Sequence, residues 1–171
     1  MRIISGKYKN RTLFTTHSKT LRPTSSSARK SIFQILEPFD NLKILDLFSG
    51  IGSLGIESLS RGAKHITFVE KNPKVISFLA KNLKKLQIND QFLLIRDDVN
   101  NYLKKCDKKY DIIFADPPYE SVDFKILLPK VSNLLNLGGI FCMEKKYENK
   151  TFHDVRIKNF GKTQFLLWKK K

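Results

Sequence analysis

The sequence predicts an α/β protein built on a doubly wound, mostly parallel sheet. Residues 44–55 contain a buried strand that ends near an acid, then glycines with G-x-G-x-x-G spacing at the start of a helix. Further along, strand-type apolar runs alternate with helix-type periodicities. An acid lies at the end of four of these strands, and ligands of such sheets bind at those ends.

The segment before the sheet predicts a β-hairpin and a helix. Residues 2–6 and 11–14 flank a polar turn at 7–10, and the N-cap candidates at 24–27 precede a helix with one apolar face. Pro38 ends this helix, because the residue before a proline avoids the helical region. We therefore expect residues 1–40 to form an extension and residues 41–171 to form the sheet domain.

The sheet domain alternates strands and helices from the glycine loop onward. Helices are expected at 72–86, at about 99–103 and at about 123–136, the last kinked or split by Pro129. Strands are expected at 44–47, 65–70, 92–95, 110–115 and 140–143, with two more at about 152–158 and 163–169. The chain is long enough to bury a full core around seven strands.

Composition argues against several classes of protein. No apolar stretch approaches the ~18 residues of a membrane span, and the N-terminus lacks the long apolar region of a secretory signal. Cys106 and Cys142 lie outside any metal-ligand spacing, so we expect reduced core thiols in a cytoplasmic protein. The three histidines are scattered, and no metal site is expected.

Charge is unevenly distributed along the chain. The net charge is +16, and residues 1–36 hold eight Lys or Arg and no acid, whereas residues 37–144 are nearly neutral. Residues 145–171 again hold nine bases against two acids. A polyanionic partner, nucleic acid above all, explains basic ends around a neutral centre. The alternative is biased composition, since lysine outnumbers arginine 25 to 7.

The strand-end acids indicate a nucleoside-type cofactor. Glu70 ends the second strand, where a carboxylate suits a bidentate contact with ribose hydroxyls, in NAD or in S-adenosylmethionine. Asp46 lies four residues before the first glycine, and Asp-x-x-x-Gly-x-Gly resembles the first motif of S-adenosylmethionine-dependent methyltransferases. An acid beside the loop is tolerable there and can help to place the cofactor's ammonium group, because this cofactor has no phosphate.

The most specific motif is Asp116-Pro117-Pro118-Tyr119, which resembles the D/N-P-P-Y/F signature of methyltransferases that act on exocyclic amines. The Asp116 carboxylate and the Pro117 carbonyl are two acceptors for the N–H groups of such an amine, which aims its lone pair at the methyl donor. Proline has no N–H to compete locally, and Tyr119 offers a ring on which the target base can stack.

The order of the motifs narrows the resemblance further. Nearly the whole chain is similar to the bacterial 16S ribosomal RNA guanine-N2 methyltransferase family, through these segments: 2–6, 21–24, Arg29, Phe33, 46–50, 68–70 and 116–119. The resemblance implies a Rossmann-like methyltransferase sheet and methyl transfer to N2 of one guanine in small-subunit rRNA. The substrate is then an assembled or partly assembled subunit, and the enzyme a monomer.

The resemblance also implies two sets of site residues. The cofactor pocket comprises Asp46, Phe48, Gly50, Gly52, Glu70, Asp98 and Val99, with Asp97 remaining as the alternative to Asp98 for the adenine contact. An RNA-facing extension contributes Arg2, Lys7, Lys9, Arg11, Arg22 and Arg29.

Three other functions use some of the same features. A DNA or other RNA amino-methyltransferase shares the motifs, although 171 residues leave little room for a target-recognition region. An RNA-binding protein with an unused pocket would bind the cofactor without turnover. An NAD oxidoreductase would need hydride-handling residues, and the sequence shows none.

Overall fold

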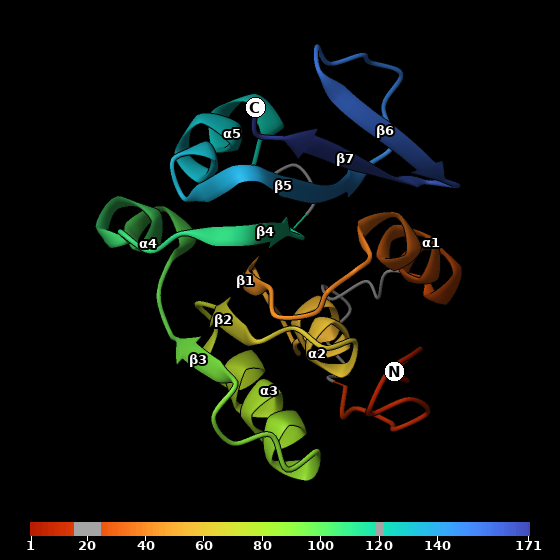
Figure 1. Ribbon diagram of the computed structural model, residues 1–171, viewed down its shortest axis with the longest axis vertical. Coiled ribbons are helices and arrows are strands. Elements are labelled where there is room, and N and C mark those ends of the chain that lie inside the picture. Colours follow the sequence, from red (N-terminus) through yellow and green to blue (C-terminus); the bar gives the residue numbers. More distant parts are fainter. Residues whose placement is uncertain (16–24, 119–121) are drawn as a thin grey trace.

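The computed structural model describes residues 1–15, 25–118 and 122–171. Within these ranges the chain forms one seven-stranded sheet in the order β3-β2-β1-β4-β5-β7-β6 (Figure 1). The neighbours from β3 through β5 pair in parallel, whereas β7 pairs antiparallel with both β5 and β6. The strands are β1 Lys43–Leu47, β2 His65–Val69, β3 Phe92–Ile95, β4 Tyr110–Ala115, β5 Leu135–Lys146, β6 Val155–Phe160 and β7 Thr163–Lys169. The predicted mostly parallel sheet is confirmed.

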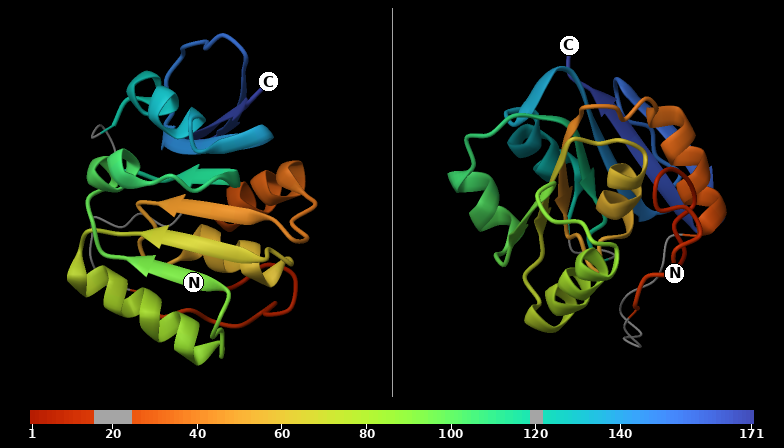
Figure 2. Two further views of the ribbon diagram at one scale, coloured as in Figure 1. Left: turned by 60° about the vertical axis from the view of Figure 1, so that its left-hand side comes forward. Right: turned by 60° about the horizontal axis from the view of Figure 1, so that its bottom comes forward.

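In the described ranges, five helices cover the two faces of the sheet (Figure 2). One face carries α1 Ser26–Leu36, α2 Ser53–Ser60 and α3 Pro73–Lys85, and the other carries α4 Val99–Lys105 and α5 Phe124–Ser132. Side-chain caps set most of their starts: Ser25, Asn72, Asp98 and Asp123 each accept a backbone N–H from the first turn. None of the helices in the described part of the chain is long and apolar enough to cross a membrane.

Alternation along the strands assigns each residue to one of two cores. Ile44, Ile112, Phe114 and Cys142 belong to the core under α1, α2 and α3, and the residue that follows each of them belongs to the core under α4 and α5. Two residues past Phe114 on the same face comes Asp116, and two past Cys142 comes Glu144. The pleat therefore directs both acids to the face that α1 covers.

The N-terminal extension differs from the predicted hairpin. Its only described ladder pairing is the antiparallel bridge between Arg2 and Thr12, and the rest of the turn is held by backbone bonds such as Ile3 N–H to the Arg11 carbonyl at 3.0 Å. Ile3 and Leu13 enter the same core as α1 to α3. The extension thus forms part of the main core.

Strand β5 is longer than predicted. It begins at Leu135, five residues before the predicted start at residue 140, and continues to Lys146. Leu135 pairs with Tyr110, and the register with β4 shifts before Ile112 pairs with Ile140. The predicted helix at 123–136 correspondingly ends at Ser132, with Pro129 inside it.

Candidate active site at the carboxyl edge

The chain order reverses between β1 and β4, so the carboxyl ends of these two strands border the crevice where such sheets bind ligands. The glycine loop follows β1, and the Asp116 segment follows β4. The backbone N–H of Asp116 lies 3.4 Å from the Leu47 carbonyl, which ties the two segments together. The sheet thus brings the two most informative motifs of the sequence to one edge.

Asp46 accepts a hydrogen bond from the backbone of the third glycine of the loop motif. It is buried, and its Oδ2 accepts the Gly55 N–H at 2.9 Å. A Cβ on Gly55 would lie 2.2 Å from the Phe68 ring, so only glycine permits this approach of α2 to the sheet. Burial raises the pKa of Asp46 to about 7; the Gly55 N–H opposes this shift, and nearby Glu70 adds to it. The described contact of Asp46 is therefore with the loop backbone.

Glu70 joins the glycine loop to the end of β2. Its Oε2 accepts the Gly50 N–H at 3.0 Å, and its Oε1 accepts the Asn72 N–H at 2.8 Å. Each carboxylate oxygen has two lone pairs, so one remains on each oxygen for a further donor. This partly exposed pair of acceptor oxygens fits a ligand that presents two neighbouring hydroxyls as donors, as a ribose does.

Three loop residues take left-handed backbone conformations. Phe48 has φ 57°, unusual for a bulky residue, Gly50 has φ 54°, and Gly52 has φ 87° at the N-cap of α2. Strained positions such as that of Phe48 concentrate at ligand-binding loops. All three residues belong to the predicted cofactor pocket.

The end of β3 carries both candidates for the adenine contact. Asp97 accepts the Asp98 N–H at 2.7 Å through Oδ1. Asp98 caps α4 through Oδ1, and its side chain is 41% exposed with Lys71 Nζ 4.0 Å from Oδ2. Val99, which starts α4, is buried. Both carboxylates are half-buried at this edge, so Asp98 stays a prediction with Asp97 as its alternative.

Asp116 is half-buried and lies between Ala115 and Pro117, which are both buried. Burial raises the pKa of Asp116 well above its ordinary value, and the charges of Glu144 and Asp46 raise it further. Pro117 is buried and Pro118 is exposed. Tyr119 lies outside the described residues.

Glu144 is the site residue that sequence reasoning missed. It is 3% exposed and follows the apolar residues 140–143 of β5, the same signal that marked the other strand-end acids. Ala115 pairs with Met143 in the parallel ladder, so Asp116 and Glu144 are the next residues on neighbouring strands.

The predicted RNA-contacting residues divide into two groups. Arg2, Lys7, Lys9 and Arg11 are exposed on the extension, and Arg22 lies outside the described residues. Arg29 is 1% exposed, and its Nη2 donates to the Arg2 carbonyl at 3.2 Å. The expectation that Arg29 lies on an RNA-facing surface is therefore wrong, because α1 turns this side chain inward against the sheet.

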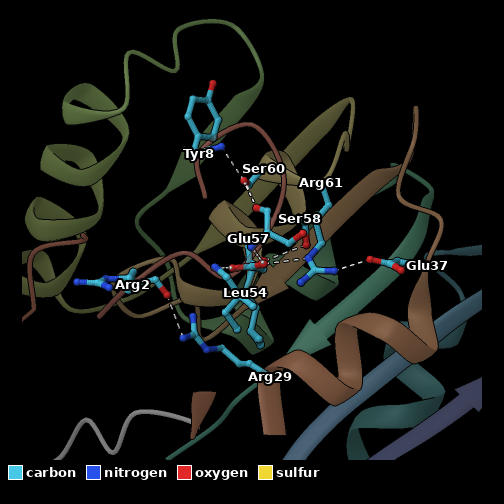
Figure 3. A network of polar contacts seen from close by, with 11 residues as sticks. Arg2, Tyr8, Arg29, Glu37, Leu54, Glu57, Ser58, Ser60 and Arg61 are labelled. Carbon is cyan, nitrogen blue, oxygen red and sulfur yellow. Dashed lines mark hydrogen bonds and ion pairs between the residues drawn. The ribbon is translucent and has the colours of Figure 1, made fainter. Parts of the chain in front are cut away.

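Glu57 anchors the extension to α2 (Figure 3). One of its carboxylate oxygens accepts the Ile4 N–H at 2.8 Å, and the other accepts the Ser5 N–H at 3.1 Å and Arg61 Nε at 2.9 Å. Lys7 N–H bonds to the Ser60 carbonyl at 2.7 Å. The basic turn therefore lies at the C-terminal end of α2, away from the glycine loop at its start.

A comparison with family models shows which protein family the chain belongs to. A model described as Conserved hypothetical protein 95 matches residues 1–169. The chain belongs to this family. The match takes in the N-terminal extension as well as the sheet.

Relatives of known name support the resemblance predicted from the sequence. The chain is 41% identical over 155 residues to "Ribosomal RNA small subunit methyltransferase D" of Buchnera aphidicola subsp. Baizongia pistaciae, covering 88% of this chain and 79% of the relative. It is 35% identical over 183 residues, at full coverage of both chains, to "Putative rRNA methyltransferase YlbH" of Bacillus subtilis.

A solved structure shares the fold over the whole chain. "Putative methyltransferase yhhF from Escherichia coli" superposes with a TM-score of 0.88 at 27% identity, covering 100% of this chain and 98% of that one. The predicted methyltransferase-type sheet is confirmed.

Proposed function

We propose that this protein transfers a methyl group from S-adenosylmethionine to the exocyclic N2 amine of a guanine in small-subunit ribosomal RNA. The observation that carries the proposal is the Asp116-Pro117 segment at the β1–β4 crevice, next to the glycine loop. The names of the relatives, ribosomal RNA small subunit methyltransferase among them, support the class of substrate.

Asp116 and Pro117 would hold the target amine. An aromatic amine is a poor nucleophile, because its lone pair is delocalised into the ring. A carboxyl oxygen and a carbonyl oxygen that accept its two N–H groups orient and localise that lone pair. Pro117 is buried and has no backbone N–H. Its carbonyl can therefore face the target amine without a competing local hydrogen bond from this residue. Tyr119 would provide the stacking ring.

The other side of the crevice would hold the cofactor. Glu70 would accept the ribose hydroxyls, and Asp98 and Val99 would border the adenine. Phe48, Gly50 and Gly52 would bring the loop backbone close, held in place by Asp46. S-Adenosylmethionine supplies an electrophilic methyl on its sulfonium sulfur. In the reaction the S–CH₃ bond breaks as the N–C bond forms, and the amine then loses a proton.

The target guanine must be accessible at N2. A paired guanine presents N2 in the minor groove, bonded to its partner, so the base must be unpaired or flipped out. Unstacking costs least in single-stranded loops, which favours such a nucleotide. A small subunit in which the loop is already exposed would be a better substrate than a free duplex.

The decisive experiment measures single-turnover methyl transfer to small subunits that lack the modification. Asp116→Ala should lower the rate by about 10²–10³, the typical cost of one preorganised polar partner, and should leave S-adenosylhomocysteine affinity nearly unchanged. Asp107→Ala, an exposed acid at the opposite edge of the sheet, is the matched control. A near-normal rate for Asp116→Ala would show that the methyl transfer centre is elsewhere.

Mass mapping of methylated nucleosides identifies the product. Cells without this gene should lose one N2-methylguanosine from small-subunit rRNA, and the recombinant protein should restore it. Loss of N6-methyladenosine instead would favour the adenine-specific alternative. Binding of the cofactor with no loss of any modification would favour the non-catalytic RNA-binding alternative.

A further inference from the structure

A carboxyl that the sequence motifs leave unassigned lies beside the proposed methyl-transfer centre. Asp116 and Glu144 follow the paired residues Ala115 and Met143 on adjacent parallel strands, which run about 4.8 Å apart. Asp116 and Glu144 lie two residues beyond Phe114 and Cys142, respectively, on the same face of the sheet. The two side chains therefore project from neighbouring positions into one buried layer.

A buried cation faces that layer from α1. Phe33 packs its ring on Phe114 with the centroids 5.8 Å apart, and Arg29 precedes Phe33 by one helical turn, toward the carboxyl edge of the sheet. Among the described residues, Nε and Nη1 of Arg29 have no hydrogen-bond partner. Burial lowers the pKa of the Arg29 guanidinium, and the charges of Glu57 and Glu144 act against that shift.

We propose that Glu144 is a positioning residue of the methyl-transfer centre: from the strand next to Asp116 and near the buried Arg29, its carboxyl group controls whether Asp116 is charged. The proposal rests on the proposed function in one respect, that Asp116 contacts the target amine. Neutral Asp116 can still accept one N–H through its carbonyl oxygen. Charged Asp116 also stabilises the positive charge that develops on the attacking nitrogen.

The charged and titratable groups that act on Asp116, on its neighbours or on Arg29 come from two helices and three strands. They are Arg29 of α1, Glu57 of α2 with its partner Arg61, Asp46 of β1, Glu70 at the end of β2, and Cys142 and Glu144 of β5. The charge of Glu144 acts on Asp116 more strongly than the charge of Asp46 does. Glu144 is thus the acid whose removal most directly changes the electrostatic potential at Asp116.

The direct test is a carbon-13 titration of protein labelled at the aspartate carboxyl carbons. The Asp116 signal is assigned by its loss in Asp116→Asn. In the wild-type protein its midpoint should lie well above the ordinary aspartate value of about 3.9. In Glu144→Gln the midpoint should fall by about two pH units, the effect of removing a unit charge about 5 Å away at an effective dielectric constant of about 20. Glu144→Asp should retain the raised midpoint.

Glu148→Gln is the matched control, because this acid follows the same strand but pairs with Lys145 and Lys150. It should leave the Asp116 midpoint in place. An unchanged midpoint in Glu144→Gln overturns the proposal. An ordinary midpoint in the wild-type protein also overturns it, and that measurement needs no variant to fold.

A second readout separates this inference from the proposed function. The single-turnover rate should rise with pH as Asp116 ionises, and its acid limb should move in Glu144→Gln by the same interval as the carbon-13 midpoint. If Glu144→Gln shifts the carbon-13 midpoint of Asp116 but not the acid limb of the rate–pH profile, Glu144 is not a positioning residue for the reaction. If the wild-type protein transfers no methyl group, the proposed function is wrong. The carbon-13 titration then still decides whether Glu144 controls the protonation of Asp116.

Discussion

Removing the Glu57 carboxylate should release the N-terminal extension at a large cost in stability. This carboxylate holds the backbone N–H groups of Ile4 and Ser5 and the Arg61 Nε at 2.8, 3.1 and 2.9 Å. The side chain of Glu57 is fully buried, and that of Arg61 is 6% exposed. Glu57→Ala therefore leaves two amide donors and the Nε of Arg61 without their acceptor.

The size of the effect follows from burial. Removing one member of a buried ion pair costs about 3–5 kcal/mol, and each unsatisfied amide costs about 1–3 kcal/mol where water cannot replace the acceptor. These costs overlap because all three donors share one carboxylate, so we expect about 4 kcal/mol for Glu57→Ala. Glu57→Gln keeps one acceptor oxygen and should cost about half as much.

Arg61 provides an internal control. Its Nη1 also pairs with Glu37, whose side chain is 49% exposed. Exposed pairs contribute about 0–1 kcal/mol, so Glu37→Gln should have little effect. Urea denaturation followed by the fluorescence of Trp168, the single tryptophan, measures all three variants. A loss in Glu57→Ala no greater than that in Glu37→Gln would refute the anchoring role of Glu57.

Two further predictions concern the ligands. Glu70→Ala should weaken S-adenosylhomocysteine binding by about 2 kcal/mol or more in calorimetry, because charge-assisted hydrogen bonds are the stronger ones. An unchanged affinity would show that Glu70 does not bind the cofactor. Asp98→Ala tests the adenine side of the pocket in the same way. Replacing Lys7, Lys9 and Arg11 with glutamine should reduce the slope of log affinity for RNA against log salt by about two to three, because fewer condensed counterions are released. The matched control replaces three exposed lysines on the other face of the sheet. Lys104 and Lys105 are the last residues of α4, and Lys108 follows that helix. Equal slopes in the two triple variants would show that the basic turn does not contact RNA.

The anchoring contacts change how the extension is best tested. Deleting residues 1–20 would remove Ile3, Tyr8 and Leu13 from the core and leave Glu57 without its two amide donors. Such a deletion would lower stability whatever the extension does with RNA. The three side-chain replacements avoid this problem, because the contacts that hold residues 4–8 on α2 are made by the backbone.

The sequence by itself determined the features that depend on local spacing. A strand, its terminal acid and the turn that follows occupy consecutive residues, so Glu70, the glycine loop and the Asp116 motif could be placed at strand ends from the order of residues alone. Because parallel strands share one carboxyl edge, that placement also predicted that these acids would face a common crevice. The parallel pairing of β1 with β2 and β4, and of β2 with β3, confirms that these strands share one carboxyl edge, whereas the roles of the acids stay a prediction.

Only the tertiary structure decided the roles that depend on which elements pack together. Arg29 lies in an acid-free basic segment, which predicts a surface role, but the packing of Phe33 on Phe114 turns it into the protein beside acids of α2 and β5. Glu57 meets amides more than 50 residues away in the chain, and local spacing carries no information about such a contact. Glu144 had the same strand-end signal as Asp116, but its importance comes from the register of β4 against β5 and the helix laid over them. Burial gives these charges their effect, because groups removed from water interact strongly only with the partners that the fold places beside them.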